Sequence, residues 1–380
     1  MRTWAEINLD AVENNIKNIR KITDKNAKIM GIVKADAYGH GFYEVARTLA
    51  DNGADCFGVA TYDEALKLRE KGFSQDILIL ATIPSEDIRG AVLKAITLPV
   101  YSYDYAKLIS DAAISENVKA RVHIKLDTGM SRIGYVVNDS DNSEVADEII
   151  KISKLPNLEV EGIFSHFSTS DEADDTYTRL QFKRFMSVCR QLENKGLCIP
   201  IKHIANSAAI MMYPEYHLDM VRPGIILYGL YPSDDVDKKR LPLVPVMTLK
   251  SKITCLKNLE KDRGVSYGKE YITDEVRHIA TVPVGYADGY IRDYARGGEM
   301  IVNGEKVKIV GRICMDQCMI DVTNVHNISI GDEVTIFSDK EITADTLAKI
   351  SKTINYEVVC LISKRVPRIY LKDEKAVKSS

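Results

Sequence analysis

Short apolar runs alternate with longer amphipathic segments up to about residue 235 of the chain. In segments such as 61–71 and 175–195 the apolar residues recur at helical spacing, whereas the short runs are near-continuous in Ile, Val, Leu and Phe. We therefore expect strands separated by helices. The predicted strands cover residues 29–33, 56–60, 77–81, 98–101, 121–126, 160–164, 201–205 and 224–230.

This alternation is typical of a parallel sheet whose faces are covered by helices. Eight repeats fit an α/β fold of the TIM-like (β/α)8 barrel type, which typically takes about 250 residues. The eighth repeat is irregular, so periodicity alone leaves a doubly wound sheet open as an alternative. The pattern favours the barrel.

The pattern changes after residue 231. A polar stretch over 234–240 precedes Pro242 and Pro245, as in a linker, and Asn303-Gly304 has the composition of a hairpin turn. We expect a barrel over residues 1–237 and a mainly-β C-terminal domain over 238–380. The strands predicted there are 246–256, 278–284, 300–302, 307–310, 319–322, 333–337 and 358–362, with a short helix over 344–351.

Composition argues against several classes of partner. The chain has 51 Lys plus Arg against 54 Asp plus Glu, a net charge of −3, which lacks the basic excess of a nucleic-acid or membrane-surface protein. No apolar stretch reaches the ~20 residues of a membrane span. The seven cysteines include no Cys-x-x-Cys and no Cys/His cluster with zinc spacing. We expect a cytoplasmic protein with no nucleic acid, membrane or metal partner.

Polar side chains lie at the ends of the predicted barrel strands. Lys34 follows the first strand, Lys125 lies near the end of the fifth, and His166 follows the sixth. Asn206 follows the seventh, and Arg222 shortly precedes the eighth. Because a (β/α)8 barrel carries its active site at the carboxyl ends of its strands, we expect these groups to converge.

Lys34 has two readings, a salt-bridged or snorkelling side chain and a Schiff-base nucleophile. Gly39 favours the second reading, because glycine lets the backbone approach a ligand closely. Tyr38 favours it too, because it brings a hydroxyl near the lysine. Segments 206–209 and 222–225 lie where such barrels bind phosphate. An aldehyde-reactive lysine beside a phosphate site suggests pyridoxal 5'-phosphate (PLP), although phosphorylated sugars bind at the same place.

Nine motifs occur in order over both predicted domains. They are VKADAYGHG at 33–41, KLDTGMSRIG at 125–134, SHF at 165–167, HIANSA at 203–208, MVRPGI at 220–225, VSYG at 265–268, VGYADG at 284–289, GRICMDQCM at 311–319 and YE at 356–357. Through them the chain resembles the alanine racemase family, PLP-dependent enzymes of fold type III, over essentially its whole length.

The resemblance implies a racemase that interconverts L-alanine and D-alanine and supplies D-alanine for peptidoglycan. Lys34 would carry PLP and move the α-proton on one face of the substrate. Tyr267, reaching in from the partner subunit of a homodimer with shared active sites, would serve the other face. His166 would hydrogen-bond toward that tyrosine and to Arg222, which would face the pyridine nitrogen.

The resemblance also implies the walls of the site. Lys125, which is carbamylated in many relatives, would position Arg132 near the phenolic oxygen of PLP and the substrate carboxylate. The substrate would contact Arg132, Met315, Tyr267 and Tyr356, with Asp316 in support. The cofactor would contact Lys34, Tyr38, Asn206, Ser207, Arg222, Gly224, Ile225 and Tyr356.

Other functions share parts of this pattern. A racemase of the same fold for serine or a basic amino acid would need a different pocket, and bulky Tyr356 favours a substrate with a methyl side chain. A fold-type III decarboxylase has no use for Tyr267 as a second base. A PLP carrier protein of the barrel family lacks the second domain. A catalytically dead binding paralogue is disfavoured because Lys34 and Tyr267 are both present.

Overall fold

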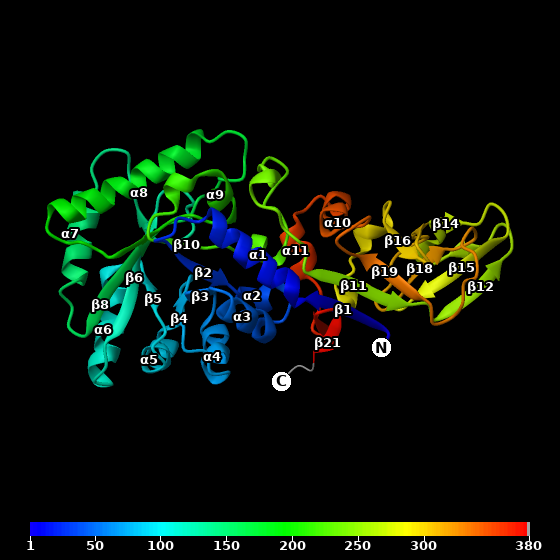
Figure 1. Cartoon of the computed structure of the whole chain (residues 1–380), viewed down its shortest axis with the longest axis horizontal. Helices are drawn as coiled ribbons and strands as arrows, with labels where there is room; N and C mark the ends of the chain where they lie inside the picture. Colours follow the sequence, from blue (N-terminus) through cyan, green and yellow to red (C-terminus); the bar gives the residue numbers. More distant parts are fainter. Residues whose placement is uncertain (378–380) are drawn as a thin grey trace. The chain divides into compact units, whose positions relative to one another are not determined.

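The computed structural model describes residues 1–377 and divides into two compact units (Figure 1). The barrel unit holds residues 12–37 and 45–243. The β unit holds residues 1–11, 38–44 and 244–377. Each unit is therefore built from separated segments, whereas the sequence pattern predicts one cut between residues 237 and 238.

Eight parallel strands form the barrel unit. They are arranged in two sheets, β10-β2-β3-β4 and β5-β6-β8-β9. A parallel bridge between Leu78 and Thr97 joins β4 to β5, and the Arg222 N–H donates to the Ala205 carbonyl just beyond β10 and β9. The ring is therefore closed, which confirms the barrel over the doubly wound sheet. The strands are β2 (Lys28–Ile32), β3 (Cys56–Val59), β4 (Asp76–Ile79), β5 (Leu98–Val100), β6 (Ala120–Asp127), β8 (Leu158–Phe164), β9 (Ile201–His203) and β10 (Met220–Val221).

The helices of the barrel unit lie outside the barrel strands in Figure 1. Helix α4 shows why such a segment is helical: Thr61 and Glu64 form a capping box at its start, and Ala65 and Leu68 bury one face. The helices are α1 (Leu9–Ile22), α3 (Phe42–Asp51), α4 (Tyr62–Glu70), α5 (Ser85–Leu93), α6 (Tyr103–Ser115), α7 (Ser143–Ile152), α8 (Thr176–Asn194) and α9 (Ser207–Met212). The short strand β7 (Tyr135–Val136) pairs with β6.

The predicted eighth strand at 224–230 is wrong. The eighth strand is Met220–Val221, and the apolar residues after Gly224 form a buried 3-10 helix, η2 (Ile225–Tyr228). A short buried apolar run looks the same in a strand and in a helix, so hydrophobicity alone does not separate them. The correction places Arg222 directly after the eighth strand instead of before it.

The β unit contains a seven-stranded sheet in the order β17-β16-β19-β11-β1-β20-β21, a three-stranded sheet β12-β15-β18 and a two-stranded sheet β13-β14. Strand β1 (Thr3–Asn8) lies inside the largest sheet, antiparallel to β11 and parallel to β20. This pairing explains why the first residues of the chain belong to the β unit. The other strands are β11 (Met247–Lys252), β12 (Cys255–Leu259), β13 (Gly264–Val265), β14 (Tyr271–Ile272), β15 (Arg277–Val282), β16 (Glu299–Val302), β17 (Glu305–Lys308), β18 (Cys318–Asp321), β19 (Glu333–Phe337), β20 (Arg368–Lys372) and β21 (Lys375–Val377).

Three local predictions in the β unit have different outcomes. The hairpin at Asn303-Gly304 is confirmed, since both residues have positive φ and join β16 to β17. The strand predicted at 358–362 is wrong, because Asn355–Cys360 forms helix α11 and buries Val358 and Val359 together. The predicted short helix is α10 (Ala344–Ser351).

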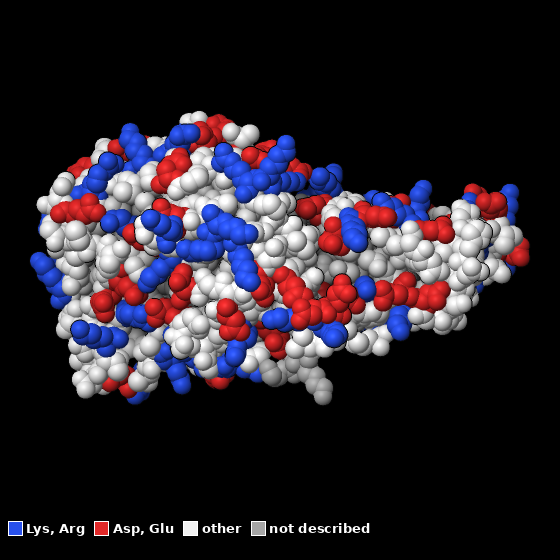
Figure 2. Space-filling model, in the orientation of Figure 1, with Lys and Arg blue, Asp and Glu red and all other residues white. Residues whose placement is uncertain are grey.

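The charge on the surface is as balanced as the composition. Basic and acidic side chains are interspersed over most of the face drawn in Figure 2. Within residues 1–377, every helix is too short or too polar to span a bilayer.

Candidate active site

Four of the predicted site residues lie at the same end of the barrel strands. Lys34 comes two residues after β2 ends, and Lys125 lies near the end of β6. His166 comes two residues after β8 ends, and Arg222 directly follows β10. Parallel strands bring their carboxyl ends to one face of a barrel, so these side chains share that face.

His166 lies at the centre of a group of cations. Burial lowers the pKa of its imidazole well below the ordinary value, and nearby positive charges lower it further. His166 is therefore neutral at physiological pH. The cations that act on its pKa are Arg222, Lys125, Arg132 and Lys34, so the structure brings all five predicted residues together.

Arg222 is only 4% exposed, and two of its guanidinium nitrogens make hydrogen bonds. Nη1 contacts Nδ1 of His203 at 2.9 Å, while Nη2 donates to the Ser165 carbonyl at 2.7 Å and the Ile204 carbonyl at 3.1 Å. Nη2 also lies 3.2 Å from Nδ1 of His166. Burial and neighbouring Arg132 lower the pKa of Arg222 to about 9. The guanidinium therefore stays charged at neutral pH.

Lys125 is a buried lysine, 3% exposed. Its Nζ donates to the Leu126 carbonyl at 3.0 Å and lies 5.0 Å from the centre of the Phe164 ring. Burial lowers the pKa of this amine to about 7, and Arg222 and Arg132 add to the effect. A large fraction of Lys125 is therefore the uncharged, nucleophilic amine near pH 7.

The loop that carries Arg132 is shaped by Asp127, the last residue of β6. The Asp127 carboxylate accepts from the N–H groups of Gly129 and Ser131 at 3.0 and 2.9 Å. Gly134 lies so close to β6 that a Cβ on it would come within 2.8 Å of the Asp127 nitrogen. These contacts fold the loop back onto the barrel and set the position from which the exposed Arg132 extends.

The predicted phosphate wall is partly assembled. The Asn206 side chain caps helix α9 by accepting from the Ala209 N–H at 3.1 Å. The Ser207 hydroxyl accepts from the Gly224 N–H at 2.9 Å, and Ile225 follows as the first residue of η2. The structure thus brings Ser207 and Gly224 together.

The segment after Lys34 has an unusual backbone. Ala35, Asp36 and Ala37 have φ of 52°, 54° and 53°, so α2 (Lys34–Tyr38) is a left-handed turn. Non-glycine residues pay about 1–2 kcal/mol each in this region. The Ala35 N–H donates to Glu64 at 2.6 Å, which helps to hold the strained turn. Strain of this kind clusters at functional sites, and the sequence pattern did not reveal it.

Tyr38 and Tyr356 lie together in the β unit, with ring centres 6.1 Å apart. Burial raises the pKa of the Tyr38 phenol, which therefore stays protonated and can donate a hydrogen bond. Gly39 has φ of 79°, and a Cβ on it would lie 2.3 Å from the Val359 carbonyl oxygen. Only glycine fits there, so the Tyr38 segment is fixed against α11.

Tyr267 and Met315 are exposed on neighbouring loops of the β unit, at 70% and 53%. The Ser266 hydroxyl donates to the Arg312 carbonyl at 2.6 Å and so ties the two loops together. Tyr267 is thus not a core tyrosine. The two tied loops thus present both bulky side chains to solvent.

Asp316 is held by a charged network in the β unit. It accepts from Arg365 at 2.8 Å, and Arg365 also lies 3.2 Å from the buried carboxylate of Asp288. Arg2, which directly precedes β1, also pairs with Asp288. The network fixes the loop that presents Met315.

Family models match both parts of the chain. One described as "Alanine racemase, N-terminal domain" matches residues 7–232, and one described as "Alanine racemase, C-terminal domain" matches residues 246–370. The chain belongs to the alanine racemase family. It is therefore an enzyme of the racemase class, in a family that depends on PLP.

Individual alanine racemases resemble the chain over nearly its full length. The alanine racemase of Clostridium tetani is 50% identical and covers 97% of this chain and 95% of the relative. The solved alanine racemase of Clostridium difficile is 45% identical, with a TM-score of 0.96 over 100% of this chain and 98% of that one. The alanine racemase of Bacillus anthracis with bound L-Ala-P is 36% identical, with a TM-score of 0.92 over 99% and 97%.

Two residues of this racemase site were missed by sequence reasoning. His203 and Ser165 both contact Arg222, although only Arg222 was predicted to act. Both lie in motifs used for the resemblance, and His203 is the last residue of β9, so a search of every polar strand-end residue would have found it. Among residues 1–377, no cluster of His, Cys, Asp and Glu is arranged to hold a metal ion.

Proposed function

We propose that this chain interconverts L-alanine and D-alanine, with PLP bound through Lys34 and with Lys34 and Tyr267 as the two proton-transfer groups. The observation that carries the proposal is the convergence of Lys34, three further cations and neutral His166 at the carboxyl end of the barrel. The family membership supports the same reaction.

The residues present fit PLP. A cluster of cations around an uncharged histidine favours an anionic ligand, and PLP carries a phosphate and a phenolic oxygen. Lys34 supplies the amine for its aldehyde. Tyr38, Asn206, Ser207, Gly224, Ile225 and Tyr356 would hold the phosphate and ring, with hydroxyl and backbone donors of the kind that phosphate sites use.

Racemisation requires one group that removes the α-proton and another that returns a proton from the opposite face. When bound, PLP withdraws the electron pair left on the substrate carbon. Lys34 moves the proton on one face and the Tyr267 hydroxyl on the other. Arg132 would orient the substrate carboxylate, and the charged Arg222 would lie against the ring nitrogen of bound PLP and disfavour its protonation.

Lys125 would act as a carbamate. Its pKa of about 7 leaves the amine partly uncharged near neutral pH, so its nitrogen can form a bond to the carbon of CO2 and release one proton to solvent. The product carries a negative charge in place of a positive one. That charge would pair with Arg132 and hold it in position.

We propose a homodimer in which Tyr267, Met315 and Asp316 of one subunit complete the site of the other. Exposed Tyr267 and Met315 in the β unit support this arrangement, because each would be buried by a partner. The second domain predicted over 238–380 would then serve both catalysis and assembly. Activity would fall on dilution as the dimer dissociates.

Alanine is the proposed main substrate, and D-alanine for peptidoglycan is the proposed product use, in the cytoplasm. Tyr267, Met315 and Tyr356 are bulky, which favours a methyl side chain. A hydrophobic pocket rejects an added hydroxyl by only about 10²-fold, so slow turnover of serine is expected. A racemase with serine or a basic amino acid as main substrate is the second candidate.

The proposal is tested by incubating purified protein with PLP and L-alanine in D2O. Proton NMR follows loss of the α-proton, and chiral chromatography of the same tube follows D-alanine. Both signals together are expected. Exchange without inversion would overturn the two-base mechanism, and faster turnover of serine, lysine or arginine than of alanine would overturn the substrate.

A further inference from the structure

A line of hydrogen-bonded side chains crosses the interior of the barrel, starting from Arg222. Nη1 of Arg222 contacts Nδ1 of His203 at 2.9 Å, and Nε2 of His203 contacts Nδ1 of His123 at 2.8 Å. Nε2 of His123 lies 3.3 Å from Oε2 of Glu161. The line joins the proposed active-site end of the barrel to its other end.

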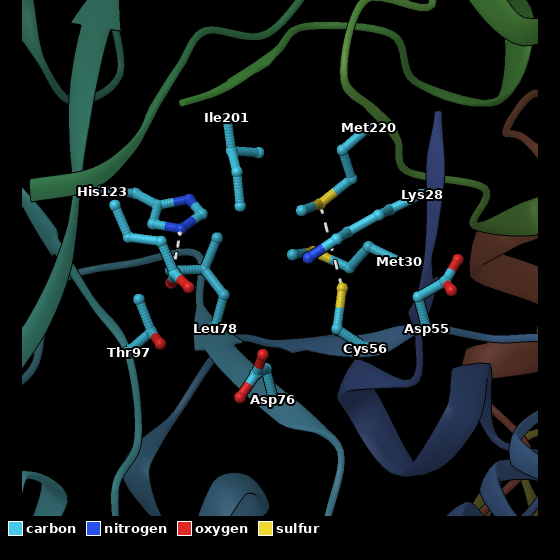
Figure 3. Close-up of a pocket in the computed structure, with 11 residues that line it drawn as sticks. Lys28, Met30, Asp55, Cys56, Asp76, Leu78, Thr97, His123, Ile201 and Met220 are labelled. Carbon is cyan, nitrogen blue, oxygen red and sulfur yellow. Dashed lines mark hydrogen bonds and ion pairs between the residues drawn. The ribbon is translucent and has the colours of Figure 1, made fainter. Parts of the chain in front are cut away.

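Glu161 lies in a pocket at the amino ends of the strands, together with His123 and the strand-start residues Lys28, Asp76 and Met220. In Figure 3, His123 and Ile201 lie on one side of this pocket and Cys56 and Met220 on the other. The Glu161 side chain is 19% exposed, so the line runs from buried Arg222 to a carboxylate that reaches solvent.

Only one arrangement of protons satisfies all three contacts. A guanidinium can only donate, so Nδ1 of His203 accepts and its Nε2 carries the proton. That Nε2–H donates to Nδ1 of His123, which must then accept, and His123 donates through Nε2 to the carboxylate of Glu161. Both imidazoles are therefore neutral, both as the Nε2–H tautomer.

Burial supports the same protonation. His203 and His123 are almost wholly buried, and burial together with Arg222 lowers the pKa of each imidazole. The Glu161 carboxylate raises the pKa of His123, whereas Arg121 lowers it together with Arg222. For His203 the acting groups are Arg222, His123 and Lys125.

The barrel is built around these rings. Phe164 stacks on His203 with ring centres 4.9 Å apart and planes 6° from parallel. A Cβ on Gly162 would lie 2.5 Å from Nδ1 of His123, so the glycine makes room for this imidazole. In the β6–β8 register Val122 pairs with Val160 and His123 with Gly162, so Glu161 is the extra residue of a bulge in β8.

We propose that Glu161 and His123 are positioning residues for Arg222, acting through His203 from the far end of the barrel. The other acceptors of Arg222 are the backbone carbonyls of Ser165 and Ile204 and the neutral His166. Glu161 supplies the negative charge at the end of the line, and each proton donor points toward it. The inference rests on the proposed function, in which Arg222 faces the cofactor ring.

The first test needs no variant. Nitrogen-15 NMR of histidine-labelled protein, with and without PLP, reports which ring nitrogen carries the proton. We expect the Nε2–H tautomer for both His203 and His123 from pH 6 to 8. An Nδ1–H tautomer or a doubly protonated ring at either position overturns the proposal, whatever the racemase activity.

The second test compares four variants. His123→Leu removes the acceptor of His203, whereas His123→Gln offers an amide that can accept from His203 and donate to Glu161. Glu161→Gln removes the charge but keeps an acceptor. Asp76→Asn removes a carboxylate of the same pocket that pairs with Arg121 at 2.7 Å and is outside the line.

We expect His123→Leu to shift the nitrogen-15 resonance of Nε2 in His203, which loses its acceptor while Arg222 keeps the tautomer, and to lower kcat/KM about tenfold, as for one lost buried hydrogen bond. His123→Gln should restore kcat/KM to within about twofold of the wild type. Glu161→Gln should have a value between those of the two His123 variants, and Asp76→Asn should match the wild type. An unchanged Nε2 resonance of His203 in His123→Leu, or an equal loss of kcat/KM in Asp76→Asn, overturns the proposal. If His123→Leu does not fold, Glu161→Gln against Asp76→Asn decides.

The two proposals fail in different ways. An inactive wild-type protein with both histidines in the Nε2–H form would count against the proposed function only. An active wild-type enzyme with either histidine in another form would count against the positioning role only.

Discussion

Arg222 donates a hydrogen bond from Nη2 to Nδ1 of His166 across 3.2 Å. Because a guanidinium has no acceptor, Nδ1 of His166 carries no proton and the neutral ring donates through Nε2. One arginine therefore determines the tautomers of two histidines, His166 and His203. The direction of hydrogen bonding at the site follows from this single buried charge.

Arg222→Lys tests that conclusion. A lysine has one donor nitrogen and cannot contact His203, His166 and the Ser165 carbonyl at once. We expect a loss of about 2 kcal/mol or more in the free energy of unfolding and a drop of at least about 10²-fold in kcat/KM. Urea denaturation and racemisation kinetics measure the two. Arg179→Lys, at an exposed arginine paired with Asp175, is the control and should change neither.

Lys34→Ala should abolish the absorbance of bound PLP and lower turnover by at least about 10³-fold, because in the proposed mechanism the amine both holds the cofactor and moves a proton. Absorbance spectra of the dialysed protein and chiral assays measure these effects. Lys28→Ala changes a lysine at the opposite end of the same strand and should bind PLP normally. Racemisation retained by Lys34→Ala with added PLP contradicts the assigned role.

Tyr267→Phe should keep PLP bound but lower proton abstraction from L-alanine by about 10²–10⁴-fold, since in the proposed mechanism the missing hydroxyl serves one face only. Deuterium exchange from each enantiomer, measured separately, tests the asymmetry. Tyr271→Phe, in the same part of the β unit, is the matched control and should leave both rates near wild type. Equal losses from L- and D-alanine argue against a two-base division.

Lys125 makes stability depend on pH. Its pKa is about 7 when folded and near 10.4 when unfolded, so the unfolded chain binds more protons between these values and stability rises with pH in that window. From pH 7 to 9 the rise attributable to Lys125 is about 2 kcal/mol.

Urea denaturation of PLP-free protein in CO2-free buffer, compared with Lys125→Met, isolates this contribution. The variant should lack the rise, and Lys119→Met, at an exposed lysine before the same strand, should retain it. A wild type and Lys125→Met that respond identically to pH would show that the buried amine is not responsible.

The left-handed turn after Lys34 predicts a sensitive backbone position. Ala35→Val places a β-branched residue at φ of 52° and should destabilise the protein by about 1–2 kcal/mol and weaken PLP binding. Ala35→Gly, which tolerates this φ, is the control and should bind PLP as the wild type does. Fluorescence titration with PLP compares the two, and similar affinities would exclude a role for the turn in holding Lys34.

Sequence reasoning was accurate where the signal was local. Helix α4 follows from its capping box and apolar spacing, and Asn303-Gly304 follows from the preference of type I′ turns for these residues. It was wrong for 224–230 and 358–362, where short buried apolar runs are equally compatible with strand and helix. Tertiary packing decided these segments.

The strand-end residues show the same division. Lys34, His166 and Arg222 could be read from the chain because parallel strands bring their carboxyl ends together once a barrel forms. His203 and Glu161 could not be given roles, because the line from Arg222 to Glu161 depends on ring orientation and on the bulge at Glu161. Neither property has a periodic signature.

The order of apolar and polar residues by itself specified most helices, seven of the eight parallel strands and the end of the barrel that carries the candidate site residues, since these depend on spacing along the chain. Only the tertiary structure placed β1 between β11 and β20, made Lys125 a weakly basic amine and aligned two histidines behind Arg222. Those features arise when segments far apart in sequence exclude water from the same volume. Burial then determines which groups keep their charge.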